Sequence, residues 1–212
     1  MILGITGCPG SGKSVVSKVV ASKGWKLIDA DLIGREVVEQ DEAILKELTH
    51  TFGADIIGQD GKLDRRLLAR RAFVDVENTR KLNYVVHPVL LEKIKKIIRA
   101  ERIAGAHAVV DCALIYEWGI EGLFDRVVCI RAREDIRKMR LINRDGRSDE
   151  EVERIFAAQF PEELKVQKAD IVFTNNETVE NMIIYGLMLA ELPEFGSKIK
   201  SWEKYCIKNG SL

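Results

Sequence analysis

The sequence has few of the residues that build metal sites and disulfides. Its 212 residues include four cysteines and three histidines. The cysteines are scattered, none belongs to a C-x-x-C pair, and no histidine stands at ligand spacing from them, which argues against a structural metal and a disulfide framework. We therefore expect reduced thiols in a cytoplasmic protein.

Net charge and long apolar runs are also missing. The 33 basic residues balance 33 acidic ones, so the chain lacks the overall positive charge typical of a nucleic-acid-binding domain. No apolar run approaches the ~20 residues that cross a bilayer, and the first residues enter a motif directly, which leaves no room for a signal peptide. We expect neither a nucleic acid nor a membrane as a partner.

The sequence does contain enough apolar residues for an ordinary core, with 46% hydrophobic and 31% charged residues. Short apolar segments alternate with helical patterns, which predicts an α/β fold with a five-stranded parallel sheet flanked by helices. The expected strands are residues 2–6, 25–28, 107–110, 126–130 and 170–173.

The segment Gly7–Ser14 matches the phosphate-loop pattern G-x-x-x-x-G-K-[ST]. An apolar strand precedes it and a helical pattern follows, so its backbone N–H groups and a helix N-terminus point at one anion. Lys13 would reach the β- and γ-phosphates, and the Ser14 hydroxyl would ligate Mg²⁺. The expected ATP-contacting residues are Gly7, Pro9, Gly10, Ser11, Gly12, Lys13, Ser14 and Val15.

Three aspartates follow the expected strands, at the sheet edge where ligands bind in such folds. Asp31 is the candidate to accept a proton from an acceptor hydroxyl or to hold a water on Mg²⁺. Asp29 has a similar claim, and either one could instead cap the next helix. Asp111 resembles a Walker-B acid that would bind Mg²⁺, or it is a helix N-cap.

A repeated arginine pattern follows the fourth expected strand. If one helix runs that far, arginines spaced four, three, four and three residues apart form a single cationic stripe. Ser148–Glu151 matches a capping box, so residues 145–147 would join two helices. A pair of helices joined in this way suits a lid that closes over ATP. The same arginines could instead form a solvated helix face. The stripe is Arg133, Arg137, Arg140, Arg144 and Arg147, of which Arg140 and Arg144 are the strongest candidates.

Residues 33–104 form a longer connection than a crossover requires and are expected to be mostly helical. An arginine-rich helix from about residue 64 to 73 carries Arg65, Arg66, Arg70 and Arg71, which favours a phosphate-bearing acceptor over a solvated face. Pro88 should kink or restart the long helix that follows. His87 could bond the acceptor or simply belong to the kink.

Together these segments resemble the dephospho-coenzyme A kinases, from about residue 3 to 180. The phosphate loop alone is common to many kinases, whereas the other motifs are more specific. They are Ile28-Asp29-Ala30-Asp31, Gly61-x-Leu63-Asp64-Arg65-Arg66-x-Leu68, His87-Pro88, Leu114-Ile115-Tyr116-Glu117, Arg140-Leu141-x-x-Arg144-Asp145, Gln159, and Ala169-Asp170 followed by Asn175.

The resemblance implies transfer of the γ-phosphoryl group of ATP to the ribose 3′-hydroxyl of dephospho-coenzyme A, by a monomer or small homo-oligomer. Asp31 would be the base or metal-shell acid, Lys13, Arg140 and Arg144 would be catalytic, and Asn175 would lie near the adenine. The implied acceptor-binding residues are Asp31, Arg65, Arg66, His87, Leu114 and Glu117, and the implied metal residues are Ser14 and Asp31.

The family architecture implies a phosphate-loop core, a helical coenzyme A subdomain, a lid, and a tail without an assigned role. These would be residues 1–32, 105–132 and 168–192 for the core, 33–104 for the subdomain, 133–167 for the lid, and 193–212 for the tail. The sequence departs from the family pattern at Cys8-Pro9, at Ala113, and at Glu177. Pro9 removes one N–H from the phosphate loop.

Two other functions fit parts of the sequence. One is a nucleoside monophosphate kinase-like enzyme that acts on another hydroxyl or phosphate. The other is a nucleotide-dependent switch ATPase, which would need a water-orienting residue and segments ordered by the γ-phosphate. ATP turnover that stays negligible until an acceptor alcohol is added would separate the kinases from the switch.

Overall fold

The structure is a computed structural model, and it describes residues 1–195. Most of the tail that the sequence leaves without a role therefore lies outside the described residues. The chain divides into two compact units. The first contains residues 1–28 and the chain from residue 98 onward, and the second contains residues 29–97. The second unit starts and ends somewhat earlier than the predicted helical stretch 33–104.

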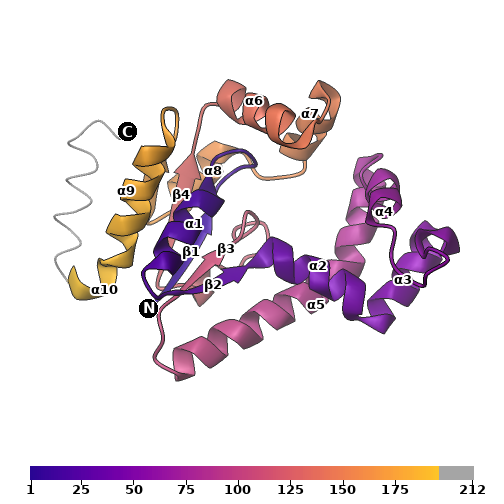
Figure 1. Cartoon of the computed structure of the whole chain (residues 1–212), viewed down its shortest axis with the longest axis horizontal. Coiled ribbons are helices and arrows are strands. Elements are labelled where there is room, and N and C mark those ends of the chain that lie inside the picture. The colour runs from indigo at the N-terminus through magenta and orange to yellow at the C-terminus, as the bar shows by residue number, and fades with distance from the viewer. Residues whose placement is uncertain (196–212) are drawn as a thin grey trace. The chain divides into compact units, whose positions relative to one another are not determined.

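The first unit is built on a five-stranded sheet with strand order β2-β3-β1-β4-β5 (Figure 1). The β1–β3, β1–β4 and β4–β5 pairs are parallel. The α/β prediction is confirmed, and three strands begin and end one residue later than predicted. The strands are β1 Ile2–Thr6, β2 Lys26–Asp29, β3 Ala108–Asp111, β4 Arg126–Arg131 and β5 Ile171–Thr174.

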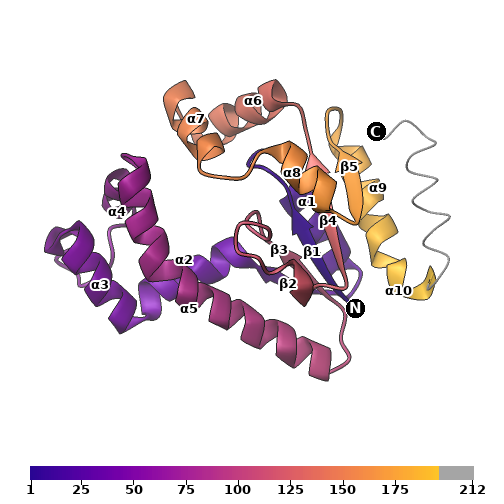
Figure 2. The same ribbon diagram turned by 180° about the vertical axis from the view of Figure 1, so that it is seen from behind.

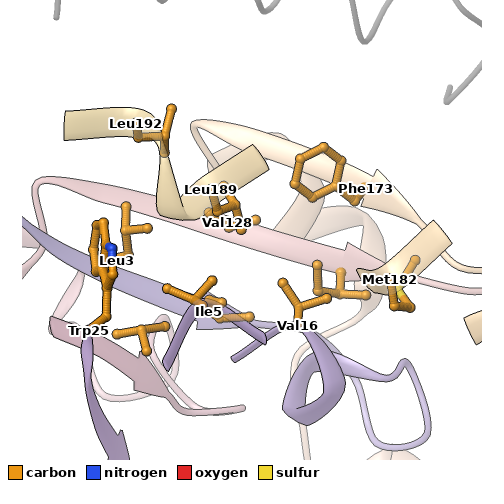
Figure 3. Close-up of a cluster of buried hydrophobic side chains, with 12 residues drawn as sticks. Leu3, Ile5, Val16, Trp25, Val128, Phe173, Met182, Leu189 and Leu192 are labelled. Atoms are coloured by element: carbon orange, nitrogen blue, oxygen red, sulfur yellow. The ribbon is translucent and has the colours of Figure 1, made fainter. Parts of the chain in front are cut away.

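The central strand β1 is buried along its whole length, as expected for a parallel sheet covered on both faces. Leu3 and Ile5 point to one face and pack in a core cluster with side chains from α1 (Lys13–Ser22) and α9 (Val179–Ala190) (Figure 3). On the opposite face Gly4 leaves no room for a side chain, because a Cβ would lie 2.8 Å from Ile115.

The remaining helices of the first unit lie between β4 and the end of the described chain. They are α6 Glu134–Asp145, α7 Asp149–Ala157, α8 Glu162–Lys168, α9 and α10 Leu192–Phe195. A short 3₁₀ turn, η2 Glu121–Leu123, lies between β3 and β4. Figure 2 shows α6, α7 and α8 following one another along the chain between β4 and β5.

The expected joint between two lid helices is present. Gly146 ends α6 in the left-handed conformation, with φ of 64°, and Ser148 and Glu151 form the predicted capping box at the start of α7. Because α6 begins after Arg133 and ends before Arg147, these two arginines lie outside the helix. The single five-arginine stripe is therefore wrong at both ends.

The second unit is helical, as predicted. Its elements are α2 Ala30–Gln40, α3 Glu42–Phe52, the 3₁₀ turn η1 Ala54–Ile56, α4 Arg65–Ala72, and α5 Val76–Ile103, which continues into the first unit. Pro88 lies inside α5, so the helix does not restart there. It changes direction along its length (Figures 1 and 2), since an interior proline removes one helical hydrogen bond while the others persist.

Candidate active site

The phosphate loop connects β1 to α1 through a turn that its glycines make possible. Gly12 caps α1 with φ of 94°, in the left-handed region. At Gly7 a Cβ atom would lie 2.2 Å from the carbonyl oxygen of Ile130, so only glycine fits between the loop and β4. The turn brings Lys13 and Ser14 into the first helical turn, where backbone N–H groups lack helical partners and attract anions.

The residues predicted to contact ATP lie together in this turn. Lys13 is half-buried, Ser14 is exposed, and Val15 begins the face of α1 that meets the core. Pro9 lines a cavity together with residues of α6, α7 and the start of α8. The side-chain oxygen of Ser11 is buried and finds no partner in the described part of the chain, which is uncommon for a polar group outside a ligand site.

Arg140 lies against the phosphate loop. Its guanidinium donates to the carbonyl oxygen of Gly10 and to Oδ1 of Asn175, both at 3.3 Å. Burial lowers the pKa of this guanidinium, which nevertheless stays protonated at any physiological pH. Arg140 therefore presents a partly desolvated positive charge beside the loop that would hold the phosphates.

Arg140 also differs from the other arginines of the predicted stripe in its partners. Within residues 1–195 it is the one member without a carboxylate at ion-pair distance. The others pair as follows: Arg133 with Asp135, Arg137 with Glu134 and Glu162, and Arg144 and Arg147 with Asp145. Arg144, predicted as the second lid arginine, is largely exposed and lies 2.7 Å from Asp145.

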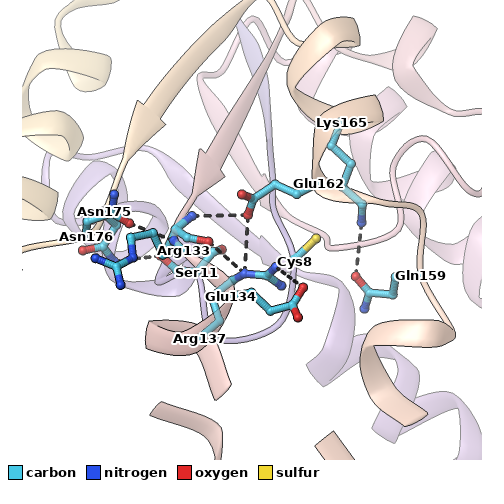
Figure 4. Close-up of polar contacts among 12 residues, drawn as sticks. Cys8, Ser11, Arg133, Glu134, Arg137, Gln159, Glu162, Lys165, Asn175 and Asn176 are labelled. Atoms are coloured by element: carbon cyan, nitrogen blue, oxygen red, sulfur yellow. Dashed lines mark hydrogen bonds and ion pairs between the residues drawn. The ribbon is translucent and has the colours of Figure 1, made fainter. Parts of the chain in front are cut away.

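Two consecutive asparagines after β5 hold the surrounding segments (Figure 4). The Nδ2 of Asn175 donates to the carbonyl oxygen of Ser11 at 2.7 Å, and its side chain is buried. Asn176 accepts from the backbone N–H of Arg133 at 2.8 Å, immediately before α6. The structure thus puts Asn175 against the phosphate loop, a contact that the sequence did not reveal.

A strand, a glycine turn, a helix N-terminus and an arginine that has no acid partner within residues 1–195 lie together, and this combination suits a phosphate chain. A family model described as dephospho-CoA kinase matches residues 1–181. The chain belongs to the dephospho-CoA kinase family. It is 40% identical over 181 residues to the dephospho-CoA kinase of Corynebacterium efficiens, a match that covers 85% of this chain and 90% of the relative.

Solved structures support the α/β fold. A crystal structure of a protein from Thermus thermophilus matches with a TM-score of 0.71 and 33% identity, covering 91% of this chain and 97% of that one. The dephospho-CoA kinase from Campylobacter jejuni matches with a TM-score of 0.64 over 90% of this chain and 95% of its own; at 22% identity it supports the fold alone. The prediction of an ATP-dependent kinase of coenzyme A biosynthesis is confirmed.

Asp29 and Asp31 take different positions in the structure. Asp29 ends β2 and caps α2, because its carboxylate accepts from the N–H of Leu32 at 3.0 Å. Asp31 lies in the first turn of α2 and is exposed. Asp29 therefore caps a helix, which is the alternative role predicted for it from the sequence. Asp111 is buried at the end of β3, in register with Ile5, and its role stays a prediction.

Some of the arginines of the second unit that were predicted to bind the acceptor form ion pairs with acidic residues of the same unit. Arg65 forms an ion pair with Glu39, and Arg71 pairs with Asp55 at 2.6 Å, which ties α4 to η1. Arg66 is exposed on α4. His87 is half-buried within α5, and burial lowers its pKa. Arg66 therefore has the freer guanidinium of the two adjacent arginines predicted to bind the acceptor.

Glu117 and Leu114 follow β3 in the first unit, and Leu114 is half-buried. The carboxylate of Glu117 accepts from the N–H of Phe160 at 2.9 Å and lies 2.8 Å from Nζ of Lys165. Lys165, a residue of α8, is fully buried and also donates to Gln159 and to the carbonyl oxygen of Ala113. The burial of Lys165 is not predictable from the sequence, because a lysine in a short charged helix normally faces water.

Residues 1–195 contain neither a metal-binding cluster of side chains nor a membrane-spanning helix. No group of three or more histidine, cysteine, aspartate or glutamate side chains is arranged to hold a metal ion. No helix in that range combines the length and the apolar character that crossing a bilayer requires.

Proposed function

We propose that this chain transfers the γ-phosphoryl group of ATP to the ribose 3′-hydroxyl of dephospho-coenzyme A, giving coenzyme A and ADP. The observation that carries the proposal is the position of Arg140. Its guanidinium touches the phosphate loop at Gly10 and has no carboxylate partner in the described chain. A positive charge so placed can stabilise the charge that develops on the transferring group.

The donor half of the mechanism depends on the loop and the start of α1. Backbone N–H groups of the loop and the helix N-terminus bind the phosphate chain, and Lys13 bonds the β- and γ-phosphates. The Ser14 hydroxyl would hold Mg²⁺ together with phosphate oxygens, a donor set that suits this ion. When bound, Mg²⁺ neutralises phosphate charge. Arg144 would add to the lid only if its ion pair with Asp145 opens.

Asp31 is the proposed base. Its carboxylate is exposed in the first turn of α2, whereas that of Asp29 is used as a helix cap. An exposed carboxylate can accept the proton of the attacking 3′-hydroxyl and orient its oxygen. Asp31 therefore suits the chemical role better than Asp29 does, and it could also order a water on the metal.

Arg65, Arg66 and His87 of the helical unit are proposed to contact the phosphates and adenosine of the acceptor. Leu114 and Glu117, which follow β3, are the acceptor candidates of the first unit. We further propose a cytoplasmic enzyme, a monomer or small homo-oligomer, without nucleic-acid or membrane partners. The balanced charge of 33 basic and 33 acidic residues supports the absence of nucleic acid.

The deciding experiment measures ADP release with three acceptors: dephospho-coenzyme A, nucleoside monophosphates, and water alone. We expect release near background with water, little with the monophosphates, and rapid turnover with dephospho-coenzyme A. Equal turnover with nucleoside monophosphates would replace this assignment by a monophosphate kinase. Turnover with water alone would indicate a switch ATPase.

A further inference from the structure

The carboxamide of Asn175 is engaged at both ends within the protein. Its Nδ2 donates to the carbonyl oxygen of Ser11 at 2.7 Å, and its Oδ1 accepts from Arg140 at 3.3 Å. Arg140 in turn donates to the carbonyl oxygen of Gly10. Asn175 and Arg140, which bond each other, therefore hold two neighbouring carbonyl groups of the phosphate loop, those of Ser11 and Gly10. Figure 4 shows Asn175 beside Ser11.

The backbone and the packing fix this carboxamide in place. The N–H of Asn175 donates to the carbonyl oxygen of Arg131 at 2.8 Å, which extends the β4–β5 pairing by one residue. The side chain is 5% exposed. A Cβ atom on Gly12 would lie 2.3 Å from its Nδ2, so the amide fills the space that Gly12 leaves open.

The bonds of Asn175 act on the face of the loop that would not meet phosphate. Carbonyl oxygens held by Asn175 and Arg140 cannot turn toward a bound anion, and the adjoining N–H groups keep the opposite direction. The bond to Arg140 also fixes the direction of the guanidinium. These bonds use one of the two Nδ2–H groups and one of the two Oδ1 lone pairs of Asn175. Because the residue is buried, its carboxamide is poorly placed to read a nucleobase.

We propose that Asn175 is a positioning residue, which holds the phosphate loop in its anion-binding form and aims Arg140, and that it does not read adenine. This inference rests on the proposed function for its kinetic consequences, but its binding consequence is independent of turnover. Loss of the Asn175 side chain should weaken binding of the phosphate chain and leave binding of the nucleoside unchanged.

The binding test compares the two halves of ATP as separate probes. Inorganic tripolyphosphate and adenosine each displace a fluorescent ATP analogue from the wild type and from Asn175→Ala. We expect about tenfold weaker tripolyphosphate binding, the effect of losing one or two buried hydrogen bonds, and unchanged adenosine binding. Weaker adenosine binding with unchanged tripolyphosphate binding would overturn the proposal, and so would no change in either.

Asn181→Ala is the matched control, because the Nδ2 of Asn181, a residue of α9, donates to Glu177, and within residues 1–195 its side chain bonds neither the loop nor Arg140. If Asn175→Ala fails to fold, the smaller polar variant Asn175→Ser takes its place in every measurement. Turnover adds a second readout: Asn175→Ala should lower kcat/KM for ATP and for GTP by the same factor. A loss confined to ATP would show base recognition and overturn the proposal.

The kinetic data also reveal whether Asn175 acts through Arg140. In the Arg140→Ala background, Asn175→Ala should lower kcat by a smaller factor than it does in the wild type, because the shared contact is already lost. Equal factors in both backgrounds would contradict the coupling. Failure of the proposed function would appear separately, as absent turnover with dephospho-coenzyme A despite normal tripolyphosphate binding.

Discussion

The Nζ atom of Lys165 lies 2.8 Å from Oε1 of Glu117, and the lysine side chain is fully buried. The same ammonium donates to Gln159 and to the carbonyl oxygen of Ala113. This cluster ties the segment after β3 to the connection between α7 and α8. Lys165 thereby fixes the point at which the chain returns from α6 and α7 to the sheet (Figure 4).

We predict that Lys165→Met destabilises the fold by about 3–5 kcal/mol, because it leaves the Glu117 carboxylate buried without its cation. The double variant Lys165→Met with Glu117→Gln should regain part of that loss, since the remaining group is neutral. Urea unfolding measures both. Losses that simply add in the double variant would contradict a coupled pair.

Lys13→Ala should abolish phosphoryl transfer while the fold persists, because Lys13 supplies the side-chain charge of the phosphate loop. The measurements are kcat with dephospho-coenzyme A and the thermal unfolding temperature. Lys18→Ala, an exposed lysine farther along α1, is the control and should leave both values unchanged. Substantial activity in Lys13→Ala would refute the phosphate-loop assignment.

Arg140→Ala should cost about 2.7–4 kcal/mol of transition-state stabilisation, the range for a preorganised donor at a developing charge. The value follows from the ratio of kcat/KM to that of the wild type. Arg133→Ala is the control, because its exposed guanidinium pairs with Asp135 at 2.5 Å. A loss below tenfold for Arg140→Ala, or an equal loss for both variants, would remove Arg140 from the mechanism.

Asp31→Asn should depress kcat strongly and leave the KM for ATP nearly unchanged, because a carboxamide cannot accept the hydroxyl proton. Asp29→Asn is a matched control: asparagine caps helices about as well as aspartate does, so its activity and stability should stay near those of the wild type. If only ATP affinity falls in Asp31→Asn, Asp31 is not the base.

Asp125 gives the fold a dependence on pH. Burial raises the pKa of its carboxyl, but the N–H of Ile2 and the guanidinium of Arg102 outweigh that effect and lower the pKa below its ordinary value. The stabilisation is therefore present above the unfolded-state pKa of ~3.9 and is lost as the pH falls through the folded-state pKa.

We predict that Asp125→Asn is less stable than the wild type at pH 6, and that this difference shrinks as the pH falls from 4 toward 3. Urea unfolding across that range measures the two curves. A difference that stays constant with pH would show that hydrogen-bond geometry, and not ionisation of Asp125, is responsible.

The sequence predicted the features that local patterns encode. The apolar segments predicted all five strands within a residue, and the Ser148 capping box located the joint of the lid. The phosphate loop was readable because its glycines, Lys13 and Ser14 are contiguous. These predictions need only neighbouring residues, whose periodicity and backbone preferences survive in the folded chain.

The partners of the side chains could not be predicted in the same way. Asn175 and Ser11 are 164 residues apart, so only the folded sheet reveals their hydrogen bond. The sequence alone does not distinguish the arginines of the predicted stripe from one another. In the structure they differ in which acidic side chains lie beside them. Nothing in the sequence marks Lys165 as buried, because its partners come from two other segments, the one after β3 and the connection between α7 and α8. The roles of Asp31, Arg66 and Asn175 in ligand binding stay predictions.

The order of the strands has a consequence for how such an enzyme can be altered. The helical unit of residues 29–97 lies in the chain between β2 and β3, two strands on one side of β1, while α6 and α7 lie between β4 and β5, two strands on the other side. Each insertion in the chain therefore begins and ends at strands on the same side of the central strand. Because Asp31, the proposed base, lies at the start of the helical unit, a foreign helical module meant to change which alcohol is phosphorylated has to be grafted between α2 and β3, which leaves both Asp31 and the phosphate loop in place.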